Sequence, residues 1–301
     1  MQKRFTMKPI HLIILSAIAL TSCGSEEVQS EVTENKTPIV QPKVVQPAVA
    51  INKVTDPKEM LGEAYQQFKE GNDEASILIA NEVLAIGRAT NNDTLIGGAL
   101  SSLCRNAQRT LDTVRLGELS TELITLAETS GDQKWMMKMA HMNAEMWRLV
   151  GNMDKAEAYY NQSMRISESI GATGMFTIDH FNKSFVSTAT GDYVEANRLI
   201  SKYYALRQEA DSTSEDAYGL IALAYLLEQK GNYEGAHEVA TVTRRLFEEQ
   251  NIFPEPPDEK PLLAVEAKVK EELSPEELEK AVLESKYQTV NGLIAKFLTT
   301  N

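Results

Sequence analysis

The chain has 301 residues, 43% of them hydrophobic and 24% charged, and its 43 acidic and 30 basic residues give a formal net charge of −13. This length allows one large or two small domains, and the composition excludes collagen-like chains, membrane bundles and wholesale disorder. The acidic balance argues against binding to nucleic acid or to anionic lipid surfaces, because both require a basic face.

The first 22 residues predict an export signal. MQKRFTMK is a positively charged start, and the apolar run LIILSAIAL, residues 12–20, has about nine residues where a membrane span requires about 20. The next stretch, LTSC at residues 20–23, resembles the lipobox of bacterial lipoproteins: an aliphatic residue, two small residues and the cysteine that receives the lipid. A secretory signal followed by a chance cysteine is the alternative.

The lipobox resemblance implies a lipoprotein signal peptide over residues 1–22 and lipidation, including palmitate, at Cys23. The chain would then be held to the membrane by this lipid alone. In that family an aspartate after the cysteine favours the inner membrane, whereas this chain has Gly24. The resemblance therefore implies the outer membrane. A body facing the periplasm is expected, with surface exposure as the alternative.

Residues 23–55 predict a disordered tether with acidic residues and prolines. The stretch GSEEVQSEVTENKTPIVQPKVVQPAVAINK, residues 24–53, has three prolines, scattered charge and no helical period. As a flexible coil, about 30 such residues would span roughly 30 Å end to end. The tether would thus hold the folded body away from the membrane.

Residues 56–251 contain a repeat of 40 residues. Four related stretches, GNDEAS, GNMDKA, GDYVEA and GNYEGA, begin at 71, 151, 191 and 231, and LDTVRL fills the place at 111. A small residue stands seven positions before the first residue of each of these five stretches, and another stands five positions after the first residue in four of them. Small residues at a fixed place allow two helices to approach closely, so each window predicts a helix, a tight turn and a second helix.

The boundaries of these helices follow from capping residues and loop-like stretches. The first helix of each pair is expected to start near Asp56, Asp93, Asp132, Thr173 and Ser214. The second helix is expected to be capped by Asn72, Asp112, Asn152, Asp192 and Asn232. The glycine before the capping residue ends the first helix.

This part of the chain resembles the tetratricopeptide repeat proteins, in their longer 40-residue variety. GDYVEA and GNYEGA are similar to that family's turn between helices, and the small residue seven positions earlier is similar to its contact point on the first helix. The second repeat departs from the pattern with Leu111 in place of glycine, and the usual proline after the second helix is missing. The resemblance implies an all-α fold, a right-handed α-solenoid of about five helix-turn-helix repeats.

Residues 252–301 predict a linker and C-terminal helices that cap the last repeat. NIFPEPPDEKP, residues 251–261, breaks the repeat, and residues 274–298 read as a helix opened by Ser274 with Glu277 completing a capping box. A solenoid exposes its last apolar face unless a cap covers it. The cap residues expected to face inward are Leu278, Val282, Val290, Leu293 and Phe297.

The sequence contains no motif for catalysis. His141, His180 and His237 lie in no zinc-binding pattern, and neither a nucleophile elbow nor a phosphate-binding glycine loop is present. We therefore predict no enzyme activity and no cofactor. His141 and Glu145 stand four residues apart, but two ligands do not make a metal site. Cys104 is expected to be a small buried residue, with a reactive thiol as the alternative.

Methionines are concentrated in KWMMKMAHMNAEMW, residues 134–147. Two interpretations are open. Methionine fills irregular gaps between helices and lends adaptability to a binding groove. It is also a soft ligand for copper(I), which gives the alternative of a small-ligand or copper-binding lipoprotein.

In the tetratricopeptide family the first helices line a concave groove that holds peptides or partner helices. Carried over by position, the groove would include Tyr65, Phe68, Arg105, Gln108, His141, Glu145, Arg148, Phe181, Phe185 and Tyr225. Arg105, His141 and Arg148 would form a basic strip suited to an acidic segment of a partner. The alternative is that these arginines pair with glutamates on neighbouring helices. The expected function is a lipid-anchored scaffold that binds a protein or peptide partner in the bacterial envelope.

Overall fold

A computed structural model describes residues 56–210, 216–251 and 254–298. These residues form thirteen α-helices and no strand. The predicted signal peptide, Cys23 and the tether to residue 55 lie outside the described residues, as does the expected helix start at Ser214. No helix in the described ranges is both long and apolar enough to span a membrane.

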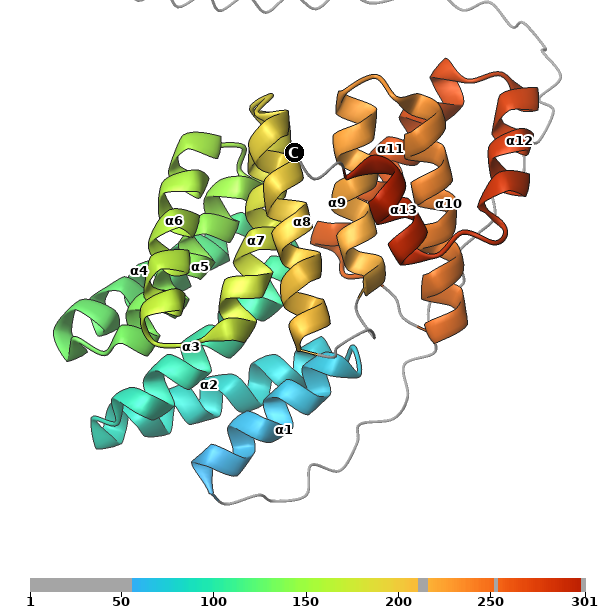
Figure 1. Cartoon of the computed structure of the whole chain (residues 1–301). Helices are drawn as coiled ribbons and strands as arrows, with labels where there is room; N and C mark the ends of the chain where they lie inside the picture. The colour runs from blue at the N-terminus through green and yellow to red at the C-terminus, as the bar shows by residue number, and fades with distance from the viewer. Residues whose placement is uncertain (1–55, 211–215, 252–253, 299–301) are drawn as a thin grey trace, which may run out of the picture. The chain divides into compact units, whose positions relative to one another are not determined.

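The first ten helices form five helix-turn-helix pairs (Figure 1). The pairs are α1 (Pro57–Lys69) and α2 (Asp73–Thr90), α3 (Asp93–Arg109) and α4 (Thr113–Ser130), α5 (Gln133–Leu149) and α6 (Met153–Ser169), α7 (Thr173–Ala189) and α8 (Tyr193–Glu209), and α9 (Asp216–Gln229) and α10 (Tyr233–Gln250). Every helix from α1 to α10 packs against the next along the chain. The predicted all-α solenoid is confirmed.

The first helices of the pairs, α1, α3, α5, α7 and α9, also contact one another in that order, and we call them the inner layer. The small residues that predicted close helix packing are all fully buried. Those on the first helices are Ala64, Cys104, Ala144, Ser184 and Ala224, and those on the second helices include Ser76, Ala156, Ala196 and Ala236. Because no long side chain holds the helices apart at these points, each pair packs tightly.

The turns within the pairs explain the recurring glycine. Gly71, Gly151, Gly191 and Gly231 have φ between 75° and 81°, a left-handed conformation that glycine adopts without steric cost. Leu111 adopts φ 56° at the same place in the second repeat. All five expected capping residues precede the second helices, and the side chain of each accepts a backbone N–H except that of Asn72.

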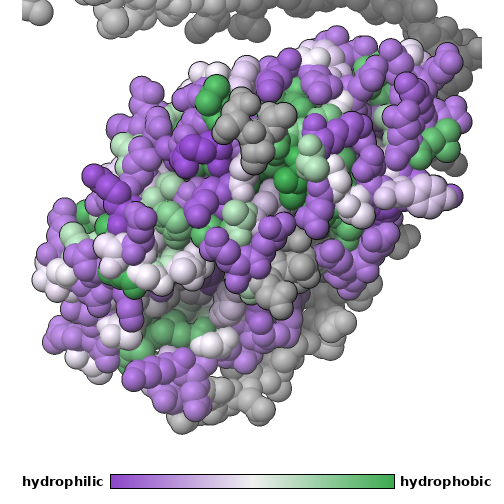
Figure 2. Space-filling view, in the orientation of Figure 1, coloured by the Kyte–Doolittle hydropathy of each residue, from purple (hydrophilic) through white to green (hydrophobic). Residues whose placement is uncertain are grey.

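Two large apolar clusters fill the body. One joins residues of α1 to α5, and the other joins residues from α7 to the C-terminal helices. Met139 and Met142 are buried in the first cluster, and Met136 and Met146 pack against it. The methionines of α5 thus fill space between helices. Figure 2 shows that the surface on the side viewed is largely hydrophilic, with apolar residues in separate small patches.

The C-terminal helices are α11 (Pro256–Glu272), α12 (Pro275–Ser285) and α13 (Val290–Phe297). The stretch predicted as a linker begins α11, and this helix packs on α9 and α10 and also touches α3. The capping box of Ser274 and Glu277 is present. The single helix expected over residues 274–298 is instead two, because Thr289 caps a new helix.

The expected inward face of the cap is partly correct. Leu293 is buried, and Val290 and Phe297 pack against the C-terminal cluster. Val282, however, is 47% exposed, so its inward placement was wrong. The buried residues of α12 are Ala281 and Ser285, which turns the face with Val282 toward solvent.

Candidate binding cavity on the inner layer

A cavity of about 780 Å³ lies on the inner layer. Residues of α3, α5, α7, α8 and α9 form its walls, and the start of α11 adds Glu255 and Asp258. Four of the predicted groove residues line it: Arg105, Gln108, His141 and Phe181. Part of the predicted groove thus coincides with this cavity, whereas the boundary of the cavity on α11 was not predicted.

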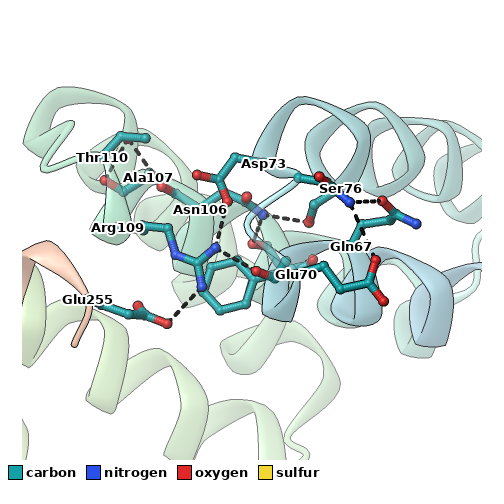
Figure 3. Close-up of polar contacts among 12 residues, drawn as sticks. Gln67, Glu70, Asp73, Ser76, Asn106, Ala107, Arg109, Thr110 and Glu255 are labelled. Carbon is teal, nitrogen blue, oxygen red and sulfur yellow. Dashed lines mark hydrogen bonds and ion pairs between the residues drawn. The ribbon is translucent and has the colours of Figure 1, made fainter. Parts of the chain in front are cut away.

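Arg109, at the end of α3, ties α11 to the first repeat (Figure 3). Its Nη1 donates to Asp73 Oδ1 at 2.7 Å and to the carbonyl of Phe68 at 2.6 Å. Its Nη2 donates to Glu255 Oε1 at 2.9 Å, and the guanidinium lies 3.3 Å from the ring centroid of Phe68. An acidic residue of the chain's own C-terminal part is thus bound by an arginine of the inner layer.

Asp258 lies one turn further along α11 and also lines the cavity. Its half-buried carboxyl group makes no hydrogen bond or ion pair with any described residue. Burial raises the pKa of the Asp258 carboxyl from 3.8 to about 7; Arg148 opposes this shift, and Glu145 and Glu255 add to it. A carboxylate that lacks donors in a partly desolvated place favours its proton.

Arg105, on α3, also lines the cavity and contributes a cation. Its guanidinium stacks over the rings of Tyr65, 4.9 Å from the centroid, and Phe68, 5.6 Å from the centroid. It makes no hydrogen bond or ion pair with any residue in the described ranges. Burial lowers the pKa of Arg105, but an arginine keeps its proton in a protein. The two rings therefore hold a charged group for which the described residues supply no anionic partner.

His141 is buried and is oriented by a carboxylate. Its Nδ1 lies 2.7 Å from Oδ1 of Asp179, a residue of α7 that is fully buried. Burial alone lowers the pKa of His141, but the hydrogen bond and the charge of Asp179, together with the charge of Glu145, outweigh it and raise the pKa. The imidazole is thus held in one orientation on the cavity wall, and its protonated form is favoured.

Glu145 and Arg148 lie beneath the cavity and neutralise each other. Glu145 is fully buried and accepts hydrogen bonds from Arg148 at 2.7 Å, from Gln108 at 2.6 Å and from the hydroxyl of Tyr160. Burial acts to raise the pKa of the Glu145 carboxyl, but the positive charges of Arg148 and His141 lower it by more. The net shift is downward, so the ionised form is favoured. Arg148 is thus paired with a glutamate, but the glutamate lies on the same helix and not on a neighbouring one as the alternative had it.

The remaining predicted groove residues lie outside the cavity lining. Phe68 is buried, and Tyr65 beside it is 47% exposed. Phe185 is buried and stacks on Tyr225 with the ring centroids 6.0 Å apart. These aromatic rings contact Arg105 and Arg148 but do not line the cavity.

Four residues in or beside the cavity were not predicted from the sequence, for two reasons. Arg109 and Asp179 do not stand at the repeat positions from which the groove residues were carried over. Glu255 and Asp258 stand in NIFPEPPDEKP, which was read as a linker. The acidic residues around two prolines in that stretch were the available signal, because proline and acidic residues are typical of a helix start.

Two other chemistries were considered from the sequence: a reactive thiol at Cys104 and a metal site at His141 and Glu145. Cys104 is buried in the core, and burial raises the pKa of its thiol to about 12, as expected for an unreactive packed residue. Within the described ranges, no group of three or more His, Cys, Asp or Glu residues is placed to hold a metal ion. His141 and Glu145, which stand four residues apart, have other partners, Asp179 and Arg148.

The fold and the site define an all-α repeat protein with a polar cavity on its inner layer. No protein-family model matches the chain, and no curated protein matches it significantly. Among solved structures, the chain is similar to BtubC (BKLC) from P. vanneervenii. The two share 16% identity with a TM-score of 0.48, over 82% of this chain and 95% of that chain.

Proposed function

We propose that the protein is a non-enzymatic scaffold of the tetratricopeptide type, which binds a protein or peptide partner on its inner layer. The observation that carries this proposal is the contact between Arg109 and Glu255 at 2.9 Å. Through it the inner layer already binds an acidic segment of its own chain. A surface that holds one acidic segment by an arginine is chemically suited to another.

Arg105 is the residue through which a partner is expected to act. Arg109 and Arg148 have carboxylate partners within the chain, whereas Arg105 has none among the described residues and lines the cavity. Arg148 is unsuitable for a charge reversal, since a glutamate beside buried Glu145 would place two like charges in the core. Reversal of Arg105 alone is therefore the informative change.

The experiment compares three full-length chains in cell envelopes after chemical crosslinking: the parent, Arg105→Glu, and Arg115→Glu as a control. Arg115 is an exposed residue of α4 that pairs with Glu118 on the same helix. We expect one defined crosslinked partner to be lost in Arg105→Glu and retained in the control. The same partners for all three chains would place binding elsewhere.

We further propose that Cys23 is lipidated and anchors the scaffold to the outer membrane, which the lipobox-like LTSC stretch supports. Incorporation of an alkyne-labelled palmitate into the parent, and its loss in Cys23→Ala, is the expected result. Equal labelling of both chains would contradict the anchor. The copper alternative receives no support from α5, since Met139 and Met142 are packed in the core.

A further inference from the structure

An arginine and an aspartate line the cavity, and neither side chain has a hydrogen-bond or ion-pair partner among the described residues. Arg105 enters from α3, and Asp258 enters from α11. Three other pairs of ionisable groups lie nearby: Arg109 with Glu255, Arg148 with Glu145, and His141 with Asp179. Arg207 and the exposed Glu209 of α8 also line the cavity. Partly buried charges are normally paired, so two unpaired charges in one cavity indicate a ligand that supplies both counter-charges.

Apolar and aromatic side chains form one part of the lining, beside polar residues such as Gln108, Thr177 and Asn182. Phe181, Ile178 and Leu206 come from α7 and α8, and Tyr203 and Tyr218 add two further rings. A volume of about 780 Å³ lies within the range of small-molecule sites, which are roughly 300–1,000 Å³ and combine apolar walls with a few convergent polar groups. The cavity thus has room for a small molecule and offers apolar surface to part of it.

We propose that this cavity binds a small zwitterion with an apolar or aromatic body, such as a free amino acid or a very short peptide. The carboxylate of the ligand pairs with Arg105, its ammonium group pairs with Asp258, and its body lies against Phe181 and Tyr203. The raised pKa leaves the Asp258 carboxyl partly protonated near neutral pH in the free chain, and an ammonium group beside it would favour its ionised form.

This inference goes beyond the proposed partner binding, although it rests on the same inner layer and also uses Arg105. The two remain separable. The experiment below uses the purified full chain and small probes, so failure of the probes to bind leaves crosslinking in envelopes unaffected. Conversely, failure to find a partner in envelopes would not change the binding of the probes that calorimetry measures on the purified chain.

The test is isothermal titration calorimetry with three related probes: L-phenylalanine, phenylacetate, which lacks the ammonium group, and phenethylamine, which lacks the carboxylate. We expect saturable binding of L-phenylalanine at one site. Each of the other probes should bind about tenfold more weakly or worse, because it leaves one buried charge unpaired. Equal binding of all three, or no saturable binding of L-phenylalanine, would overturn the proposal.

Two variants connect each charge of the ligand to its residue. Arg105→Gln should weaken L-phenylalanine and phenylacetate about tenfold and leave phenethylamine unchanged. Asp258→Asn should weaken L-phenylalanine and phenethylamine and leave phenylacetate unweakened. The matched controls are Arg115→Gln and Asp154→Asn, both exposed and outside the cavity lining, and both should bind as the parent does. Equal losses for all three probes in a variant would indicate a structural defect and count against the assignment.

A dipeptide arm distinguishes the two sources of the same chemistry. Glycyl-phenylalanine carries both charges further apart than the free amino acid. Tighter binding of the dipeptide would identify short peptides as the ligand class, and tighter binding of L-phenylalanine would identify free amino acids. Because the comparison of charged and truncated probes uses the parent chain, it remains decisive even if a variant fails to fold.

Discussion

Glu145 shows at the scale of one residue why a predicted groove position belongs to the core. Its carboxylate is fully buried and receives hydrogen bonds from Gln108, Arg148 and Tyr160. Removing it would leave the guanidinium of Arg148 buried without a counter-charge. Breaking such a pair costs far more than breaking a pair at the surface.

We predict that Glu145→Ala lowers the free energy of unfolding by about 3–5 kcal/mol, measured by urea denaturation. Glu118→Ala on α4 is the control, since its exposed pair with Arg115 should contribute less than about 1 kcal/mol. Similar small losses for both variants would show that the buried network carries little of the stability.

Asp258 predicts a pH dependence with a definite sign. Its pKa is about 7 in the folded chain and 3.8 when exposed, so the folded state binds the proton more tightly. Its contribution to stability is present at low pH, falls as pH rises from about 4 to about 7, and is constant above that range. His141 acts in the same direction, because its pKa is also raised.

Comparison of the parent with Asp258→Asn at pH 5 and pH 8 isolates this residue from His141. The free energy of unfolding of the variant, minus that of the parent, should increase between the two pH values. About two pH units lie between pH 5 and the folded pKa of about 7, which sets an upper limit of about 3 kcal/mol on the increase. A difference that is constant or decreases with pH would contradict an unpaired carboxyl group facing Arg148, Glu145 and Glu255.

At the scale of the helix and its turn, Leu111 stands in a glycine position. Its φ of 56° is left-handed, which costs a residue with a Cβ roughly 1–2 kcal/mol relative to glycine. Since the side chain is 38% exposed, little packing would be lost by removing it. We predict that Leu111→Gly raises the free energy of unfolding by about 1 kcal/mol in urea denaturation.

The reverse change supplies the control for this prediction. Gly191→Ala at φ 81° should destabilise the chain by a similar amount, although open space surrounds the added methyl group. If Leu111→Gly proves destabilising, the leucine contributes packing that its exposure does not show.

The helices and their ends could be predicted from the sequence because their causes are local. The capping residues Asp112, Asp192 and Asn232 and the recurrent glycine act within a few residues of their own place. The first turn of α11 could not be assigned in this way. Its position depends on Arg109, which stands 146 residues away from Glu255 along the chain.

Partner choice within the site was beyond the sequence for the same reason. Repeat positions placed His141 and Glu145 in the predicted groove, but the folded chain joins His141 to Asp179 and Glu145 to Arg148. Repeat positions state which helix face a residue occupies. They do not state which charged group from a neighbouring helix reaches it.

At the scale of the whole described body, the sequence repeat predicts the architecture, whereas the full lining of the cavity is seen only in the folded chain. Helices α1 to α10 pack in chain order, and the start of α11 adds the carboxyl groups of Glu255 and Asp258 to the lining of the cavity. The inner layer therefore gathers charged and aromatic residues from helices far apart in the sequence. Our central claim is that this layer, and no other face, binds the partner.

Site-specific photo-crosslinking in cell envelopes tests this claim most directly. A photoreactive phenylalanine analogue replaces Ile178, which is half exposed on the cavity wall, or Val114, which is 74% exposed on α4 outside the cavity lining. We predict a defined crosslinked partner from position 178, lost on adding Arg105→Glu, and none from position 114. Crosslinks from position 114 alone, or crosslinks from position 178 that persist with Arg105→Glu, would contradict the account.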